Sequence, residues 1–271
     1  MTLQQFSNLQ LKYQWIRRSF LILAVLSSIG LFFGQFWVLL FMLVALFVNS
    51  YLVNKFNKVA FKFKNDYLKT AIESRFPTVK YEMNSGLSQA DVYGSKLIER
   101  GDYFQSEDLL YGKINQVRFR TSDVKVQFDR LSKSGHQRVT RFRGKFYEIE
   151  LPMIVNSPVY IVNNGAEKFG IKQGLTKVDF EYIEFNNEVD VYTQKKEVAF
   201  KLLKPKAMEA ILRLRQKHGS IAFAFSNKTM AVAMEGRNSF EFYIHRRVSK
   251  KWFEQIEQEI ETLIDLVTAL Q

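Results

Sequence analysis

The chain has 271 residues, with 39 Lys or Arg, 27 Asp or Glu and a net charge of +12. It contains no cysteine, which excludes disulfides, thiolate metal sites and a cysteine nucleophile. Residues 1–65 hold seven Lys or Arg and no acidic residue, more than half of the excess positive charge. Basic charge concentrated in this way indicates attraction to anionic lipid at a cytoplasmic membrane face rather than binding to nucleic acid.

An apolar stretch without any ionisable residue occupies positions 20–48. A helix rises about 1.5 Å per residue, so crossing a hydrocarbon core takes about 20 residues, and this stretch is longer. The segment Gly30–Gln35 interrupts its middle, where a turn is expected. Two arrangements fit: one strongly tilted helix, or a hairpin whose legs are Ile16–Leu31 and Phe36–Val53.

Basic residues on both sides of the apolar stretch favour the hairpin. Such residues remain on the cytoplasmic side of a membrane. One crossing would place one cluster outside, whereas two crossings keep both clusters and both termini inside. The expected location is therefore the inner (plasma) membrane, with a multi-pass anchor. The residues expected at the membrane surface are Lys12, Arg17, Arg18, Lys55, Lys58, Lys62 and Lys64.

A cleaved signal peptide is another interpretation of the apolar stretch. Signal peptides have an apolar region of about 7–15 residues followed by a cleavage site of small residues. This stretch is longer, and the bulky residues Phe32, Phe33, Phe36 and Trp37 provide no such site. The sequence therefore favours a retained anchor.

The helical pattern continues beyond the apolar stretch. Phe56, Val59 and Phe63 recur at helical spacing, and no Pro or Gly follows until Pro77, which predicts one helix over Phe36–Arg75. Its lysine-rich face is interpreted either as a contact with lipid head groups or as an ordinary solvated face.

The expected organisation has three parts and an α+β fold. A transmembrane helical hairpin covers residues 1–54, an amphipathic juxtamembrane helix covers 55–76, and a cytoplasmic domain with a mainly antiparallel sheet and flanking helices covers 77–271. Runs rich in β-branched and aromatic residues mark the strands. The predicted strands are Thr78–Met83, Tyr111–Thr121, Val124–Leu131, Val139–Leu151, Val159–Asn163, Lys177–Phe185, Glu188–Tyr192 and Phe240–His245, with a hairpin of Ile221–Phe225 and Thr229–Met234.

Helix signals flank these strands. Ser88 is a predicted cap for a helix through Arg100, and Pro205 and Gly219 bound another. Ser249 is expected to cap a last helix. Its apolar stripe is interpreted as core packing, with pairing to a second copy as the alternative. The stripe comprises Phe253, Ile256, Ile260, Leu263, Val267 and Leu270.

Three segments resemble an uncharacterised bacterial family, number thirty-one thirty-seven among domains of unknown function. They are YFQSEDLLYGKINQVRFRTSDV (residues 103–124), RFRGKFYEIELP (141–152) and a long segment over 184–234 that contains EFNNEVDVYTQKKEVAFKLLKPKAMEAILRLRQKHG. The resemblance covers about residues 50–245 and implies a hydrophobic hairpin followed by an α+β domain. It implies no activity, because none is established for the family. Lys196 departs from the family pattern, which has an acidic residue there.

Basic side chains alternate with aromatic ones on two predicted strands, which suggests a face for phosphate or anionic lipid. An ordinary solvated sheet face is the alternative. The candidate ligand-binding residues are Arg118, Arg120, Lys125, Arg138, Arg141 and Arg143, with Lys145 beside them.

Evidence for catalysis is weak in the sequence. Glu107 and Asp108 are the candidate carboxylate pair, although neighbours on a strand point to opposite faces. His136, His218 and His245 are far apart and lack metal-ligand spacing, so surface histidines and no metal site are expected. No glycine-rich phosphate loop, nucleophile elbow or zinc-helix motif is present, and no cofactor is expected.

The sequence therefore predicts a membrane-anchored cytoplasmic binding, scaffold or sensor protein. Its expected partners are the lipid bilayer, anionic lipid, an unknown protein and a second copy of the chain, and no nucleic acid. A membrane-tethered hydrolase with an unrecognised carboxylate site is the alternative. A transporter subunit fits poorly, because the spans carry no intramembrane charge.

Overall fold

Two compact units make up the chain. The structure, a computed structural model, describes residues 1–28, 38–132, 135–164, 174–236, 240–242, 244, 248 and 250–270. Unit 1 comprises Met1–Ala71 and Glu241–Ile256, and unit 2 comprises Ile72–Phe240 and Glu257–Gln271.

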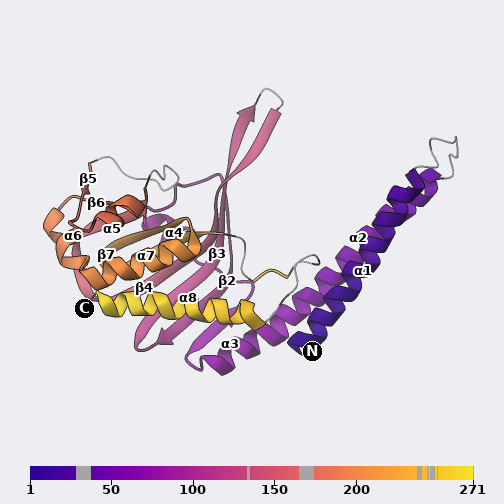
Figure 1. Ribbon diagram of the computed structural model, residues 1–271, viewed down its shortest axis with the longest axis horizontal. Helices are drawn as coiled ribbons and strands as arrows, with labels where there is room; N and C mark the ends of the chain where they lie inside the picture. Colours follow the sequence, from indigo (N-terminus) through magenta and orange to yellow (C-terminus); the bar gives the residue numbers. More distant parts are fainter. Residues whose placement is uncertain are drawn as a thin grey trace. The chain divides into compact units, whose positions relative to one another are not determined.

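Long helices dominate the N-terminal part (Figure 1). The first, α1, covers Leu3–Ser28, and α2 covers Val38–Phe63. The second continues through one π-helical turn, η2 (Lys64–Leu68), into α3 (Lys69–Arg75). The predicted helix over Phe36–Arg75 is thus confirmed from the start of α2 onward.

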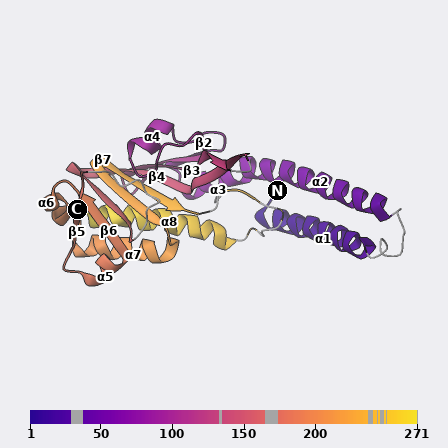
Figure 2. The same ribbon diagram turned by 90° about the horizontal axis from the view of Figure 1, so that it is seen from above.

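The helices α1 and α2 pack side by side in opposite directions (Figures 1 and 2). Phe6 near the start of α1 stacks on Phe63 at the end of α2, with ring centroids 4.1 Å apart. Farther along, Arg17 Nε donates to Asn49 Oδ1 at 2.7 Å. The polar start of α1 is therefore part of the helix pair. The predicted turn at Gly30–Gln35 lies outside the described residues.

Beyond the Arg17–Asn49 contact, both helices expose large apolar side chains. Of the described residues, one helix is long and apolar enough to cross a membrane, Leu39–Arg75, with a mean hydropathy of 1.7 in its most apolar stretch. The exposed apolar residues are Leu21, Ile22, Leu23, Val25 and Leu26 on α1, and Leu39, Leu40, Phe41, Leu43, Val44, Leu46 and Phe47 on α2.

A returning segment completes unit 1. Phe242, Ile244 and Val248 are buried in the aromatic cluster between α1 and α2, and the Val248 N–H donates to Gln10 Oε1 at 3.1 Å. The predicted strand Phe240–His245 is wrong, because the described residues there form no strand, and Phe242 and Ile244 pack against α1 and α2 instead.

An antiparallel sheet is the centre of unit 2, which confirms the expected mixture of helices and antiparallel strands. Its order is β1-β2-β3-β4-β6-β5, with β7 also paired to β4. The strands are β1 (Val79–Glu82), β2 (Tyr103–Ile114), β3 (Val117–Ser132), β4 (Gly135–Asn163), β5 (Thr176–Val178), β6 (Val189–Thr193) and β7 (Ile221–Glu235).

The strand β7 turns back on itself at its middle. The Glu235 N–H donates to the Ser220 carbonyl at 2.9 Å, although a straight strand of this length would separate its ends by about 50 Å. The C-terminal half of β7 pairs with Gly144–Glu150 of β4, and its N-terminal half pairs with Val159–Ile161. The predicted hairpin is therefore found inside β7, and β4 joins two strands that were predicted separately.

Helices cover both faces of this sheet (Figure 2). The short α4 (Gln89–Gly94) lies on one face, and α7 (Pro205–His218) and α8 (Lys250–Ala269) lie on the other. The small helices α5 (Ile183–Glu188) and α6 (Lys196–Leu202) adjoin β6.

Local sequence explains several of these helices. Ser88 and Asp91 form a reciprocal capping box at the start of α4. Pro205 is placed at the first turn of α7, and Gly219 ends it with a φ of 72°. The stripe of α8 is core packing over its described part, since Ile260, Leu263, Val267 and Leu270 are buried.

Three predicted boundaries are wrong. The strand predicted over Tyr111–Thr121 contains the turn between β2 and β3, because Asn115 and Gln116 adopt φ values of 49° and 67°. The helix predicted from Ser88 to Arg100 ends at Gly94. The strand predicted over Lys177–Phe185 is β5 followed by α5, while α6 was not predicted.

Candidate functional site: a charged pocket on the sheet

Two rows of side chains cross the sheet on the face that carries α4. In one row Lys113 pairs with Arg118, whose Nε lies 3.8 Å from Glu150 Oε2, and Glu150 pairs with Thr229 of β7. Directly paired residues point to the same face, so these four side chains lie on one surface. The row ends beside Lys228 in the β7 turn.

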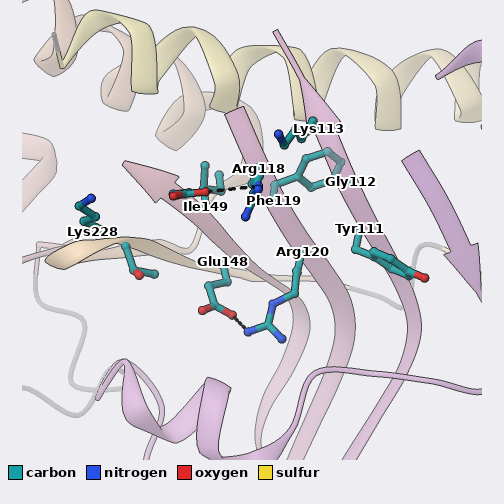
Figure 3. A pocket seen from close by; sticks show the side chains of 11 residues that line it. Tyr111, Gly112, Lys113, Arg118, Phe119, Arg120, Glu148, Ile149 and Lys228 are labelled. Carbon is teal, nitrogen blue, oxygen red and sulfur yellow. Dashed lines mark hydrogen bonds and ion pairs between the residues drawn. The ribbon is translucent and has the colours of Figure 1, made fainter. Parts of the chain in front are cut away.

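The second row runs parallel to the first. Tyr111 pairs with Arg120, and Arg120 pairs with Glu148 of β4. Together the rows line an open pocket of about 620 Å³ (Figure 3). Its charged side chains are Lys113, Arg118, Arg120, Lys228, Glu148 and Glu150.

Arg120 is neutralised by its neighbours. Its Nη2 contacts Asp91 Oδ1 at 3.0 Å and also binds Glu148. Partial burial opposes the charged form, but Glu148 and Asp91 outweigh it and raise the pKa of Arg120. Burial likewise opposes ionisation of Asp91. The hydrogen bonds from Ser88 and the positive charge of Arg120 outweigh burial, so the pKa of Asp91 is lowered. Arg120 therefore fixes α4 to the sheet.

Lys113 and Lys228 differ from Arg120. Both are exposed, and within the described ranges neither forms an ion pair. Arg118 holds Glu150 only loosely, at 3.8 Å. The pocket thus offers two unneutralised ammonium groups and one weakly held guanidinium, which suit an anion.

The six predicted ligand-binding residues do not form one face. Arg118 and Arg120 line the pocket. Lys125 and Arg143 pair with each other on neighbouring strands, but they alternate with the core residues Val124 and Phe142 and therefore point to the opposite face.

The remaining two predicted residues, Arg138 and Arg141, lie beyond the pocket, and each lies near a different carboxylate. Arg138 Nε lies 3.7 Å from Asp129, and Arg141 Nε lies 3.6 Å from Glu99.

Comparison with known proteins concerns mainly the C-terminal half. Residues 140–271 match the family model DUF3137, described as a protein of unknown function. The match confirms the family that the sequence resembles. No curated protein matches the chain.

A solved structure is similar in outline. It is the crystal structure of the mycobacterial trehalose monomycolate transport factor A, TtfA. The identity is 11% and the TM-score 0.46, over 77% of this chain and 97% of that one.

A buried polar cluster lies inside the DUF3137 segment, on the opposite sheet face. Lys145 Nζ lies 3.6 Å from Glu259 Oε1, the Tyr147 hydroxyl donates to the same carboxylate, and His218 Nδ1 lies 3.7 Å from Glu259 Oε2. The Lys145 side chain is 5% exposed and that of Glu259 12%. Lys145 is therefore buried, which excludes the solvated-face alternative for this residue.

The pKa values in this cluster follow from burial and charge. Burial opposes ionisation of Glu259, but Lys145, Tyr147 and His218 favour it and lower its pKa. Burial lowers the pKa of His218, although Glu259 pulls it the other way. Burial raises the pKa of Tyr147, and Glu259 adds to that effect. The expected surface position of His218 is wrong.

The candidate carboxylate pair is separated by a β-bulge. Glu107 is exposed, whereas Asp108 is fully buried and accepts a hydrogen bond from the Tyr81 hydroxyl at 2.5 Å. The two groups therefore do not converge on one substrate atom. Among the described residues, no group of three His, Cys, Asp or Glu side chains could hold a metal.

The other histidines take separate places. His136 is exposed on β4, and His245 lies outside the described residues.

The residues predicted at the membrane surface lie in unit 1, before the DUF3137 segment. Lys12, Arg18, Lys55, Lys58 and Lys62 are exposed, and Arg17 and Lys64 are half-buried. The Arg17–Asn49 contact brings the first cluster alongside the start of the second, at one end of the helix pair.

Proposed function

We propose that this chain is a membrane-anchored cytoplasmic binding or scaffold protein. The observation that carries the proposal is the exposed apolar surface of α1 and α2, which includes Ile22, Val25, Leu40 and Phe47. Soluble proteins rarely expose contiguous apolar patches larger than a few hundred Å², whereas lipid-facing helices do so by necessity.

The anchor is proposed to be a helical hairpin with both ends in the cytoplasm. The antiparallel packing of α1 and α2 places both basic clusters at the same end of the pair, and basic clusters remain inside. The proposed parts are the hairpin at residues 1–54, the juxtamembrane helix at 55–76 and the cytoplasmic α+β domain at 77–271.

The sheet pocket is the proposed binding site. Its proposed ligand is an anion, and a phosphate group is the simplest candidate. Lys113, Arg118 and Lys228 bind the anion, while Arg120 stays bound to Asp91 and Glu148. The proposed partners are the bilayer and a protein or lipid that carries this anionic group.

Topology is tested in the full chain, which lacks native cysteine. We expect a membrane-impermeant thiol reagent added to intact cells to label a cysteine that replaces Gly34. The same reagent should not label Lys12→Cys or Lys80→Cys until the cells are opened. Labelling of Lys80→Cys in intact cells would remove the proposed topology.

Anion binding is tested with inorganic pyrophosphate and the full chain in detergent, by isothermal titration. Lys113→Gln and Lys228→Gln should each weaken binding about tenfold, since a charge-assisted hydrogen bond contributes about 1.5–3 kcal/mol. Lys196→Gln is the matched control, because Lys196 is equally exposed on α6. Equal affinity of all three variants and the native chain would exclude the pocket.

A further inference from the structure

The strands β3 and β4 extend beyond the rest of the sheet as a two-stranded arm (Figure 1). Pairing of β2 with β3 ends at Gln127, and pairing of β7 with β4 begins at Gly144. Between these limits the described residues of the two strands form ladders only with each other. We call residues 128–132 and 135–140 the arm.

The arm is exposed on both of its faces toward its end. Residues 129–131 and 135–140 are all exposed, and Leu131, one pair from the terminal Ser132–Gly135 pair, is 81% exposed. Five residue pairs, from Phe128–Val139 to Ser132–Gly135, give the arm a reach of about 17 Å. A leucine is thus held in solvent at the far end of a projecting ribbon.

Contacts at its base keep the arm stiff. The Tyr103 hydroxyl donates to Asp129 Oδ2 at 2.8 Å, and the Arg138 guanidinium lies 3.6 Å from the centre of the Tyr103 ring. Gln127 Nε2 donates to Thr140 Oγ1 at 3.1 Å on the same face. An isolated hairpin is marginal in water, so these contacts are what allow the arm to project.

The segment that forms the arm is basic. Positions 128–140 contain three Lys or Arg, namely Arg130, Lys133 and Arg138, and a single acidic residue, Asp129, which Arg138 already contacts. Arg130 is exposed and, in the part of the chain that the structure describes, forms no ion pair. A basic surface attracts the anionic lipid of a cytoplasmic leaflet.

We infer that the arm is a lipid-contacting finger that places Leu131 in the interface of an anionic bilayer. A highly exposed apolar side chain next to a cation, as Leu131 is next to Arg130, is typical of interfacial insertion, in which the apolar side chain enters the acyl boundary and the charge binds head groups. It does not suit a protein interface, whose buried centre is depleted of charge. The inference rests on the proposed membrane anchoring.

The test uses the full chain in lipid nanodiscs and a single cysteine, Leu131→Cys, that carries an environment-sensitive fluorophore. With phosphatidylglycerol in the disc, we expect a blue-shifted emission and quenching by brominated acyl chains. With phosphatidylcholine alone, we expect neither. Ile154→Cys is the matched control, since it is 61% exposed in the same unit and should be quenched in neither lipid.

Charge reversal completes the design. Anionic vesicles are titrated onto the labelled chain in phosphatidylcholine discs, which also reveals contact with an opposing membrane. Arg130→Glu changes two charges and should weaken this contact about 30-fold, whereas Arg130→Lys should not.

The outcomes separate the two proposals. Flotation of the chain with the discs, but no quenching of the Leu131 probe by any anionic bilayer, overturns the finger and leaves the anchor intact. A blue shift without bromine quenching, with a disulfide dimer of Leu131→Cys, assigns the arm to a second copy and also overturns it. Failure of the chain to enter discs refutes the anchor and, with it, the finger, which rests on the anchor.

Discussion

Removal of the Lys145 ammonium should destabilise the domain strongly. Lys145→Met keeps the length of the side chain but leaves the Glu259 carboxylate, 12% exposed, without its cation. Removing one partner of a buried ion pair lowers the free energy of unfolding by about 3–5 kcal/mol, because the other charge stays uncompensated in a medium of low polarity. The Tyr147 hydroxyl still donates to Glu259, so we expect the lower end, about 3 kcal/mol.

Two further variants distinguish ion pairing from general damage. Arg118→Met breaks an exposed pair whose side chains are 66% and 52% exposed, and it should change stability by less than about 1 kcal/mol. The double variant Lys145→Met with Glu259→Leu should recover most of the loss, since replacing a buried pair by apolar residues is often neutral.

The measurement is urea unfolding of the full chain in detergent micelles, followed by near-ultraviolet circular dichroism. The low pKa of Glu259 means that its contribution is present above the unfolded pKa and is lost as pH falls through the folded value. In Lys145→Met, burial without the cation raises the pKa of Glu259. Lowering the pH should therefore reduce the difference in free energy of unfolding between the variant and the native chain. A loss below about 1 kcal/mol, or a gap independent of pH, would refute a buried charged pair.

Three other predictions concern stability. Burial lowers the pKa of His218 from 6.5, so the unfolded chain binds the proton more readily than the folded chain. The free energy of unfolding should therefore fall as the pH drops below that value. His218→Gln should remove this part of the pH dependence in the same unfolding assay. Ser88→Ala removes a capping box and should cost about 1 kcal/mol by urea unfolding. Gly144→Ala should cost about 1–3 kcal/mol, because its Cβ would lie 1.9 Å from the Met234 carbonyl oxygen. The matched control Gly94→Ala meets no atom within 4 Å and should leave the midpoint unchanged.

Elements with strong local signals were predictable. Pro205 and Gly219 bound α7, and the capping serine marks the start of α4, because these signals act within one helical turn. Elements fixed by distant contacts were not. The end of α4 depends on Leu97 and Ile98, which leave the helical pattern to enter the sheet core. The β2–β3 turn has no glycine at its centre, so no clear signal in the sequence marks where the turn lies.

The buried cluster shows why a charged site can be invisible in sequence. Lys145 stands in a basic run, and nothing local distinguishes it from its exposed neighbours. Its environment comes from Glu259 on α8, which is 112 positions from Tyr147, the other residue that binds this carboxylate. Only the packing of α8 on the sheet creates the low-polarity site, and no period in the sequence encodes that packing.

The basic strand residues are a different case, because part of the answer was present in their spacing. Arg118 and Arg120 are two positions apart, so strand alternation places them on one face, and the pocket confirms that they share it. Lys125 is an odd number of positions from either, which predicts the opposite face, and its pairing with Arg143 agrees. Composition therefore predicted too large a site. Counting odd and even positions along β3 would have reduced it to Arg118 and Arg120, which line the same pocket as Lys228. In the proposed anion site, we expect a neutralising substitution within that smaller set to lower the anion affinity measurably.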